Sequence, residues 1–367
     1  QAVGSYNNYT PAYSISVPSA YYPSYSAGIA APWINPLYPN AYDENLKWEE
    51  TTTWNVGVDM AWLNNRIAVA ADWYLRDTKD LLATVPVPAG MSTTNSMTRN
   101  IGTLRNIGVE FNVTARPVVT KDFTWTLGYN IGWNKNKITA LTGSADEDKS
   151  FTLDAEGNPA STSAGPIQVH KVGYPANSFY VLEQVYGPDG NPLEGVYVDQ
   201  NGDGKIGNED LIINHSRDPK VTMTLSNTFN YKNWDFGITL RASLGNYVYN
   251  AMRARMMNLS GLEGQGNILN NVIDSDFYFT SATGMTNLVR SDYFVENASF
   301  LRCDNITVGY TWDNLFRDSL RLRLFGAVQN PFVITKYSGL DPEVFSGVDN
   351  NAYPRPLTVS LGVVATF

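Results

Sequence analysis

Three features of this 367-residue sequence predict an all-β protein, a transmembrane antiparallel up-and-down β-barrel. Long segments alternate between apolar and polar residues, as strands with two different faces do. Aromatic residues make up 13% of the chain and charged residues only 17%, whereas about 25% of residues are charged in soluble domains. No run of about 18 apolar residues is present, which excludes a transmembrane helix.

The first four expected strands lie within residues 53–135. In the segment Trp54–Trp62 the even-numbered residues are apolar and the odd-numbered residues are small or polar. The segments Ile67–Leu75, Ile107–Val113 and Phe123–Trp133 repeat the pattern with apolar residues at odd positions. Successive side chains of a strand point to opposite faces, so each segment predicts a strand with one apolar face.

Five further strands are expected within residues 220–367, and Asn227 alone interrupts the apolar face of the first. The parity of the apolar positions slips around Asp304–Asn305, which predicts a β-bulge there. The five segments are Val221–Tyr231, Trp234–Leu244, Ile306–Trp312, Leu320–Val328 and Leu357–Phe367.

A soluble β-sandwich would also alternate, but the strands here favour a membrane. They run for about nine residues or more, whereas strands of globular proteins have about five or six. The charged residues within the strands lie on the polar face, as expected because a lipid-facing charge at the bilayer midplane costs roughly 2–4 kcal/mol. These residues are Asp59, Asp72, Glu110, Arg241 and Arg323.

Short and long connections alternate along the chain. The short ones are Leu63–Asn65, Pro117–Asp122, Lys232–Asn233 and Asp313–Ser319. The long ones are Thr78–Leu104, Asn136–Pro219, Tyr247–Phe300 and Phe332–Pro356. Outer-membrane barrels have short periplasmic turns and long extracellular loops. Residues 1–52 and 136–219 are therefore expected to be extracellular.

This orientation places the aromatic residues at the strand ends in two girdles, as in membrane-spanning barrels. The expected periplasmic girdle contains Trp62, Phe123, Trp125, Tyr231, Trp234, Trp312 and Phe367. The expected outer girdle contains Trp54, Trp73 and Trp133. Single-chain bacterial barrels have an even number of strands, so nine strands lead us to expect the C-terminal portion of a larger barrel.

Several segments resemble the SusC/RagA-type TonB-dependent transporters. The resemblance begins at Leu46–Leu82, continues through Asn100–Val113 and Phe123–Thr139, and spans nearly the whole chain. Its later blocks are Val172–Tyr180, Asp199–Asp210, Ser299–Tyr310 and Gly339–Val344. It implies that residues 1–367 are the C-terminal part of a 22-stranded barrel whose N-terminal plug is not in this chain.

The same resemblance implies active import across the outer membrane of a Gram-negative bacterium. The implied cargo is an oligosaccharide or a peptide. The implied partners are a SusD-like surface lipoprotein that covers the barrel, and TonB, which would act through a plug segment outside this chain. The alternative function is that of an outer-membrane adhesin or structural barrel without transport, because its strands and loops would look the same.

One motif has the spacing of a calcium-binding loop. Oxygen ligands at the first, third and fifth positions, a glycine at the sixth, a backbone carbonyl at the seventh and a carboxylate at the twelfth suit Ca²⁺. The alternative is a metal-free turn, since Asn-Gly and Asp-Gly are also strong turn signals. The candidate ligands are Asp199, Asn201, Asp203, Lys205 through its carbonyl, and Asp210.

Other functions are disfavoured. The chain has only two histidines, His170 and His215, both in loop-like segments. This leaves little material for a catalytic triad or a histidine metal site, so we do not expect an enzyme. The net charge of −9, without a conspicuous basic segment, disfavours nucleic-acid binding. Cys303 is the single cysteine and excludes an internal disulfide.

Overall fold

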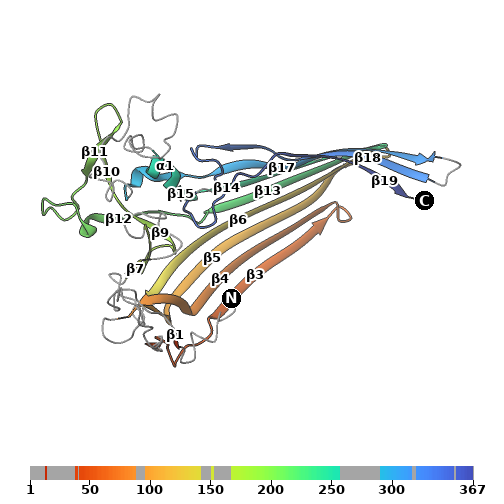
Figure 1. Ribbon diagram of the computed structural model, residues 1–367. Coiled ribbons are helices and arrows are strands. Elements are labelled where there is room, and N and C mark those ends of the chain that lie inside the picture. Colours follow the sequence, from red (N-terminus) through yellow and green to blue (C-terminus); the bar gives the residue numbers. More distant parts are fainter. Residues whose placement is uncertain are drawn as a thin grey trace, which may run out of the picture.

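The fold is described from a computed structural model (Figure 1). The structure describes residues 13–14, 38–39, 41–87, 96–141, 150–152, 167–256, 290–315, 320–350 and 353–366. Most of the expected N-terminal loop 1–52 and the terminal Phe367 lie outside these residues. Within the described residues, no helix has the length and apolar character needed to cross a membrane.

One antiparallel sheet of nine strands dominates the described chain. The strand order across the sheet is β19-β18-β17-β14-β13-β6-β5-β4-β3. Among these nine strands, each therefore pairs with the one before it and the one after it in the sequence. The strands are β3 (Glu50–Trp62), β4 (Ile67–Pro86), β5 (Ser96–Val119), β6 (Phe123–Leu141), β13 (Val221–Tyr231), β14 (Trp234–Leu244), β17 (Phe300–Asn314), β18 (Leu320–Thr335) and β19 (Thr358–Thr366).

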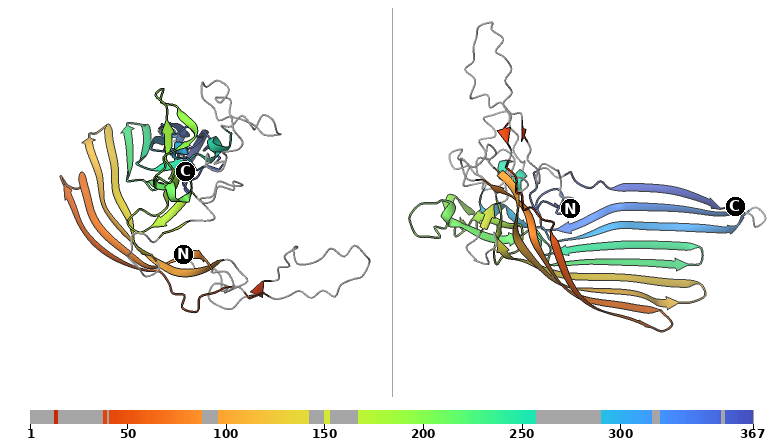
Figure 2. Two further views of the ribbon diagram at one scale, coloured as in Figure 1. Left: turned by 90° about the vertical axis from the view of Figure 1, so that its left-hand side faces the viewer. Right: turned by 90° about the horizontal axis from the view of Figure 1, so that it is seen from below.

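The sheet is curved, and its short turns and long connections lie at opposite ends (Figures 1 and 2). The left view of Figure 2 shows the sheet as an arc, with a smaller lobe on its concave side at the end of the long connections. This arrangement is a sector of an up-and-down barrel, with β3 and β19 as its two edges. All-β architecture with antiparallel strands, predicted above, is confirmed.

The nine predicted strands are all present, and most are longer than the alternation alone indicated. Val221–Tyr231 and Trp234–Leu244 match β13 and β14 residue for residue. The predicted β-bulge is also present, because Cys303 pairs with Leu240 and Asn305 pairs with Thr239, which leaves Asp304 unpaired between them. Because the bulge adds one unpaired residue, the apolar side chains before and after it can lie on the same face of the sheet.

The prediction of a long loop over Thr78–Leu104 is wrong. β4 and β5 remain paired as far as Pro86 and Ser96, so most of that segment is a β-hairpin. Two register shifts around Leu81 disturb the pairing, and they explain why the simple alternation stopped near Thr78. Ile101 of this extension is buried with Ile138, Leu141 and Val172, which gives the longer strands an apolar core of their own.

The expected loops 136–219 and Tyr247–Phe300 form much of the lobe on the concave side. Strands β7 (Ser150–Thr152), β8 (Gln168–Lys171), β9 (Ser178–Leu182) and β12 (Leu211–Ser216) form one sheet in the order β12-β9-β8-β7. Strand β10 (Gln184–Tyr186) pairs with β11 (Pro192–Tyr197), and β15 (Tyr247–Tyr249) pairs with β16 (Val295–Asn297). The additional pair expected around Ser178–Tyr186 therefore exists as two strands, but each pairs with a different partner.

Three long connections share one hydrophobic core, in which Phe179, Tyr249, Phe294 and Val348 are buried. The helix α1 (Ala251–Met256) and the 3-10 helix Asp292–Phe294 pack into this core, whereas the 3-10 helix Asn208–Asp210 lies beside β12. A minor strand pair, β1 (Tyr13–Ser14) with β2 (Tyr38–Pro39), completes the described elements. The long connections are thus mutually packed rather than independent loops.

The convex face of the sheet is apolar and exposed, as expected of a surface that contacts lipid. Trp54 is 68% exposed, Trp234 52% and Trp133 40%. Asn227, which interrupts the apolar face of β13, accepts a hydrogen bond from the indole Nε1–H of Trp125 at 3.0 Å. That bond satisfies an amide oxygen that would otherwise face hydrocarbon, where an unsatisfied polar group is costly.

The Trp125–Asn227 bond is testable in the native full-length protein folded into lipid vesicles. Trp125→Phe keeps a ring but removes the donor, so it should lower the free energy of unfolding by about 1–2 kcal/mol. Guanidinium titration followed by electrophoretic mobility measures the change. In an Asn227→Leu background the amide is gone, and Trp125→Phe should lower the free energy of unfolding clearly less. Equal costs in the two backgrounds would show that the hydrogen bond contributes nothing.

Candidate functional site

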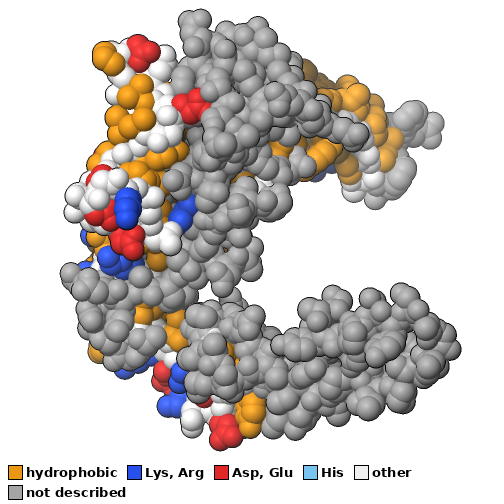
Figure 3. All heavy atoms as spheres, turned by 60° about the vertical axis from the view of Figure 1, so that its left-hand side comes forward, with side chains coloured by type: hydrophobic (Ala, Val, Ile, Leu, Met, Phe, Trp, Pro, Cys, Tyr) orange, Lys and Arg blue, Asp and Glu red, His pale blue; other side chains and the backbone are white. Residues whose placement is uncertain are grey.

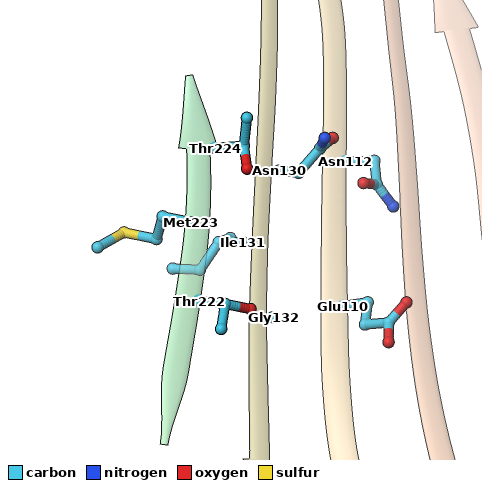
Figure 4. A pocket seen from close by; sticks show the side chains of 8 residues that line it. All are labelled: Glu110, Asn112, Asn130, Ile131, Gly132, Thr222, Met223 and Thr224. Carbon is cyan, nitrogen blue, oxygen red and sulfur yellow. The ribbon is translucent and has the colours of Figure 1, made fainter. Parts of the chain in front are cut away.

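The concave face of the sheet carries the polar half of each alternating strand. A shallow recess of about 180 Å³ lies on this face, and Figure 4 shows the side chains that line it. Its lining comes from three neighbouring strands, β5, β6 and β13. The polar lining residues are Glu110, Asn112, Asn130, Thr222 and Thr224. Side chains of this kind offer hydrogen-bond donors and acceptors along the wall of the barrel lumen.

Glycines on the concave face make room for larger neighbours. The ring of Tyr74 on β4 lies over Gly108 of β5, where an added Cβ would overlap it. The Tyr74 hydroxyl donates to the Asn134 side-chain oxygen on β6 at 3.1 Å, so one side chain reaches across three strands. The alternating glycines therefore have a packing role on the polar face.

Ion pairs join strands along the same face, one of them across the intervening strand β17 and one between the neighbours β17 and β18. The Arg323 guanidinium donates to both carboxylate oxygens of Asp235, at 2.9 and 2.6 Å. Nearer the short turns, Arg321 lies 3.0 Å from Asp313. Arg323, one of the charged residues predicted on the polar strand face, is thus held by a partner on that face.

A larger charge network joins the sheet to the connection between β18 and β19. Arg241 of β14 makes bidentate hydrogen bonds to Asp304 at 3.0 and 3.2 Å, and to Glu343 at 2.7 and 3.0 Å. Arg302 of β17 is buried and donates to Asp341 at 2.6 Å. Arg355 lies 2.9 Å from Glu343. We call these six residues the loop–wall network.

The loop–wall network fixes the connection 336–357 from one side, and the lobe holds it from the other. Tyr337 donates from its hydroxyl to the Asp349 carboxylate at 2.8 Å, and both side chains are buried. The backbone of Gly347 and Asp349 is hydrogen-bonded to Tyr249 of β15 at 2.8 and 2.9 Å. The connection is therefore a strap that is bonded to both the barrel wall and the lobe.

A cavity of about 550 Å³ lies beside this strap, on the concave side. Phe345 stands at its edge and is 91% exposed, with the Arg217 guanidinium 5.5 Å from the ring centroid. Arg217, Arg241, Glu343 and Arg355 also line the cavity. An exposed ring among fixed charged groups is suited to binding a ligand by stacking and hydrogen bonds.

Electrostatics inside the network favour ionised Glu343. Burial raises the pKa of this carboxyl, but the Arg241 guanidinium hydrogen-bonded to it, together with Arg355 and Arg302, more than offsets burial. The pKa of Glu343 therefore lies below its usual value. Because the folded-state pKa is lowered, the stabilisation is present at neutral pH and is lost as the pH falls through that lowered pKa.

Both histidines lie in the lobe and have packing roles there. His170 of β8 is within hydrogen-bond distance of the Asn177 side-chain oxygen, at 3.3 Å, and burial lowers the pKa of its imidazole. His215 of β12 is stacked on Tyr247, with ring centroids 3.6 Å apart. Burial, and then the charge of Lys220, lower the pKa of His215.

The calcium-like loop precedes β12 at the edge of the lobe. Asp199 accepts hydrogen bonds from the backbone N–H groups of Gly202 and Gly204, at 2.7 and 2.8 Å. Asn201 accepts one from Asp203 at 2.9 Å. Gly202 and Gly204 both have a φ of +76°, which favours glycine and shapes the tight turn.

The twelfth position of the motif closes the loop. Asp210 is buried and accepts from the backbone of Gln200 at 2.9 Å and of Gly207 at 2.7 Å. Asp203 accepts from the backbone of Lys205 at 2.8 Å. In the described part of the chain, no three His, Cys, Asp or Glu side chains are grouped as metal ligands. That grouping does not count the amide of Asn201 or the backbone carbonyl of Lys205, which are among the expected ligands. Calcium binding here therefore stays a prediction.

Sequence reasoning missed the loop–wall network as a site. It placed Arg241 on the polar face but paired it with nothing, and it treated Gly339–Val344 only as a block of family resemblance. That block contains both acids of the strap, Asp341 and Glu343. Two carboxylates in a segment far along the chain from the strand arginines do not reveal their partners, because only the folding of the connection after β18 onto the wall brings them together.

Breaking the loop–wall network should loosen the strap. In the native full-length protein, Glu343→Gln leaves Arg241 with Asp304 only, so backbone amides of residues 336–350 should exchange with deuterium several-fold faster. Lowering the pH of the unsubstituted protein below the usual glutamate range of about 4.3 should have the same effect. Asp122→Asn, in a short turn at the other end, is the control. Unchanged exchange in Glu343→Gln would contradict the strap.

Known proteins resemble this chain over its whole length. The family described as TonB dependent receptor-like, β-barrel matches residues 2–330. TonB-dependent receptor SusC of Bacteroides thetaiotaomicron is 44% identical, over 100% of this chain and 36% of SusC. TonB-dependent receptor P3 of Formosa agariphila is 29% identical, over 89% of this chain and 35% of P3. The chain thus spans little more than a third of these relatives.

Among solved structures, the RagAB peptide transporter has the same fold, with a TM-score of 0.74 over 98% of this chain and 38% of that chain, at 23% sequence identity. None of these proteins is named as an enzyme, which agrees with the expectation from the histidines. The resemblance found in the strand segments is confirmed. The chain belongs to the TonB-dependent receptor family, and it supplies β-barrel strands of the SusC type.

Proposed function

We propose that this chain is the barrel part of an outer-membrane, TonB-dependent active transporter of a Gram-negative bacterium. The observation that carries the proposal is the two-faced curved sheet, apolar and aromatic outside and polar inside, in a chain 44% identical to SusC over its full length. Such a wall separates lipid from a water-filled lumen. Energy from TonB would enter through a plug segment outside this chain.

The proposed cargo is an oligosaccharide or a peptide, and the proposed partner is a SusD-like lipoprotein that covers the outer end. RagAB is a peptide transporter. The concave face supports either cargo, because its amide, hydroxyl and carboxylate groups can bond to sugar hydroxyls or to peptide backbone. The lobe and the strap lie at the end of the sheet that such a lid would contact (Figure 1).

Uptake by cells tests the proposal. Cells carrying the intact gene should accumulate a radiolabelled oligosaccharide or peptide mixture, and uptake should stop when tonB or this gene is deleted. An affinity tag on the native protein should bring down a lipoprotein, and its intact mass should be well over twice 40.6 kDa. Surface attachment without TonB-dependent uptake of either mixture would favour the alternative, an adhesin or structural barrel.

We also propose a structural calcium ion in the loop Asp199–Asp210, supported by its ligand spacing and its closed turn geometry. Millimolar Ca²⁺ should protect this loop from proteolysis, since extracellular sites of this kind have dissociation constants of about 10⁻⁴–10⁻³ M. Asp203→Ala should remove the protection and the heat of binding in calorimetry. The same substitution at Asp189, in the turn between β10 and β11, is the control. Absence of any calcium-dependent heat would rule out the site.

A further inference from the structure

Basic side chains gather on the convex face of the sheet at its long-connection end. In the pairing of β5 with β6, Arg105 lies directly opposite Lys137, and Ile107 lies opposite Lys135. Odd-numbered residues of β6 share the face of Trp133, so both lysines lie on the lipid-facing side. They follow Trp133 by two and four residues, or roughly 7 and 13 Å along the strand.

These cations are only partly neutralised. Arg105 makes a bidentate pair with Asp77, at 2.7 and 3.0 Å. Lys135 and Lys137 are exposed, and neither forms an ion pair with a residue that the structure describes. The carboxylate of Asp77 offsets the charge of Arg105, whereas the ammonium groups of Lys135 and Lys137 are available to an external anion.

A cavity of about 500 Å³ adjoins Lys135. It lies between the outer end of β6 and the lobe, and Trp133, Tyr174, His215 and Lys220 line it as well. Asp218 is the acidic residue of the lining, and its carboxylate already accepts a hydrogen bond from the Asn136 amide at 2.7 Å. The ammonium group of Lys135 therefore lies next to aromatic surface.

We infer that Lys135 and Lys137, beside the ring of Trp133, form a binding site for the phosphate-bearing headgroup of an outer-leaflet lipid. The inference goes beyond import, since the site lies on the outside of the barrel wall. Its position beside Trp133 supports a lipid, because Trp rings mark the headgroup level of a bilayer and basic side chains next to them attract anionic headgroups. The lysine stems can lie along the apolar surface while their ammonium groups reach the phosphate.

Figure 3 gives a view with the lobe end brought forward, and basic and acidic side chains are interspersed there with hydrophobic ones. The chain carries 26 Lys and Arg residues and 35 Asp and Glu residues, which gives a net charge of −9. The pair Lys135 and Lys137 is thus a local positive charge on a chain of net negative charge. A headgroup bound at this position would also help to fix how deeply the barrel sits in the outer leaflet.

Native mass spectrometry of the full-length protein in detergent, titrated with monophosphoryl lipid A, tests the site. The double variant K135Q/K137Q should bind about tenfold more weakly, since each basic residue near an anionic surface contributes substantially to attraction. The control K121Q/K232Q removes the same charge from short turns at the other end and should bind as the parent does. Heat-modifiable electrophoretic migration verifies that every variant is folded.

Three outcomes would overturn the inference. One is unchanged lipid binding by K135Q/K137Q, and another is an equal loss in K121Q/K232Q, which would mean non-specific charge attraction. The third is displacement of the lipid by inorganic phosphate at the same concentration, which would mean a site for the free anion. Selective loss in K135Q/K137Q, with phosphatidylcholine unbound by all variants, supports the headgroup site.

Discussion

The structure depends on one constraint, that strands in a lipid environment keep polar and charged groups off the face that meets hydrocarbon. Every strand of the main sheet obeys it by alternation, and hydrogen bonds between strands satisfy the backbone. Asn227, which interrupts the apolar face of β13 between the two aromatic girdles, has the Trp125 indole as its donor. Polar side chains are thereby collected on the concave face, so the constraint that permits membrane insertion also supplies the surface available to cargo.

The concave face is organised by charge pairs that reach beyond the sheet. Arg241 and Arg302 on the wall hold Asp341 and Glu343 of the strap, and the strap also bonds to Tyr249 in the lobe. Removing one member would leave a partly buried charge without its partner, and an unpaired buried charge destabilises the folded protein strongly. The lobe and the wall are therefore one connected body around the cavity at Phe345, and the opening of the barrel at this end is shaped by that connection.

The sequence predicted the sheet far better than its surroundings. Val221–Tyr231 and Trp234–Leu244 were found to the residue because a strict two-residue period and a two-residue turn define both strand and boundary. The β4–β5 extension was missed because a register shift near Leu81 destroys the period while pairing continues. The loop–wall network and the Lys135–Lys137 patch were invisible for another reason. The network joins residues that only chain folding brings together, and the two lysines meet Arg105 of the next strand only through cross-strand register.

The most direct test of the account is the facing of alternate residues along β13 in the membrane. Single cysteines placed at positions 222–229 of the full-length protein, in a Cys303→Ala background without other cysteines, would carry spin labels. The account predicts a period of two, with oxygen reaching labels at 223, 225 and 229 and a water-soluble nickel chelate reaching labels at 222, 224 and 226. Uniform accessibility, or the same alternation with its phase reversed, would contradict a wall that separates lipid from a polar lumen.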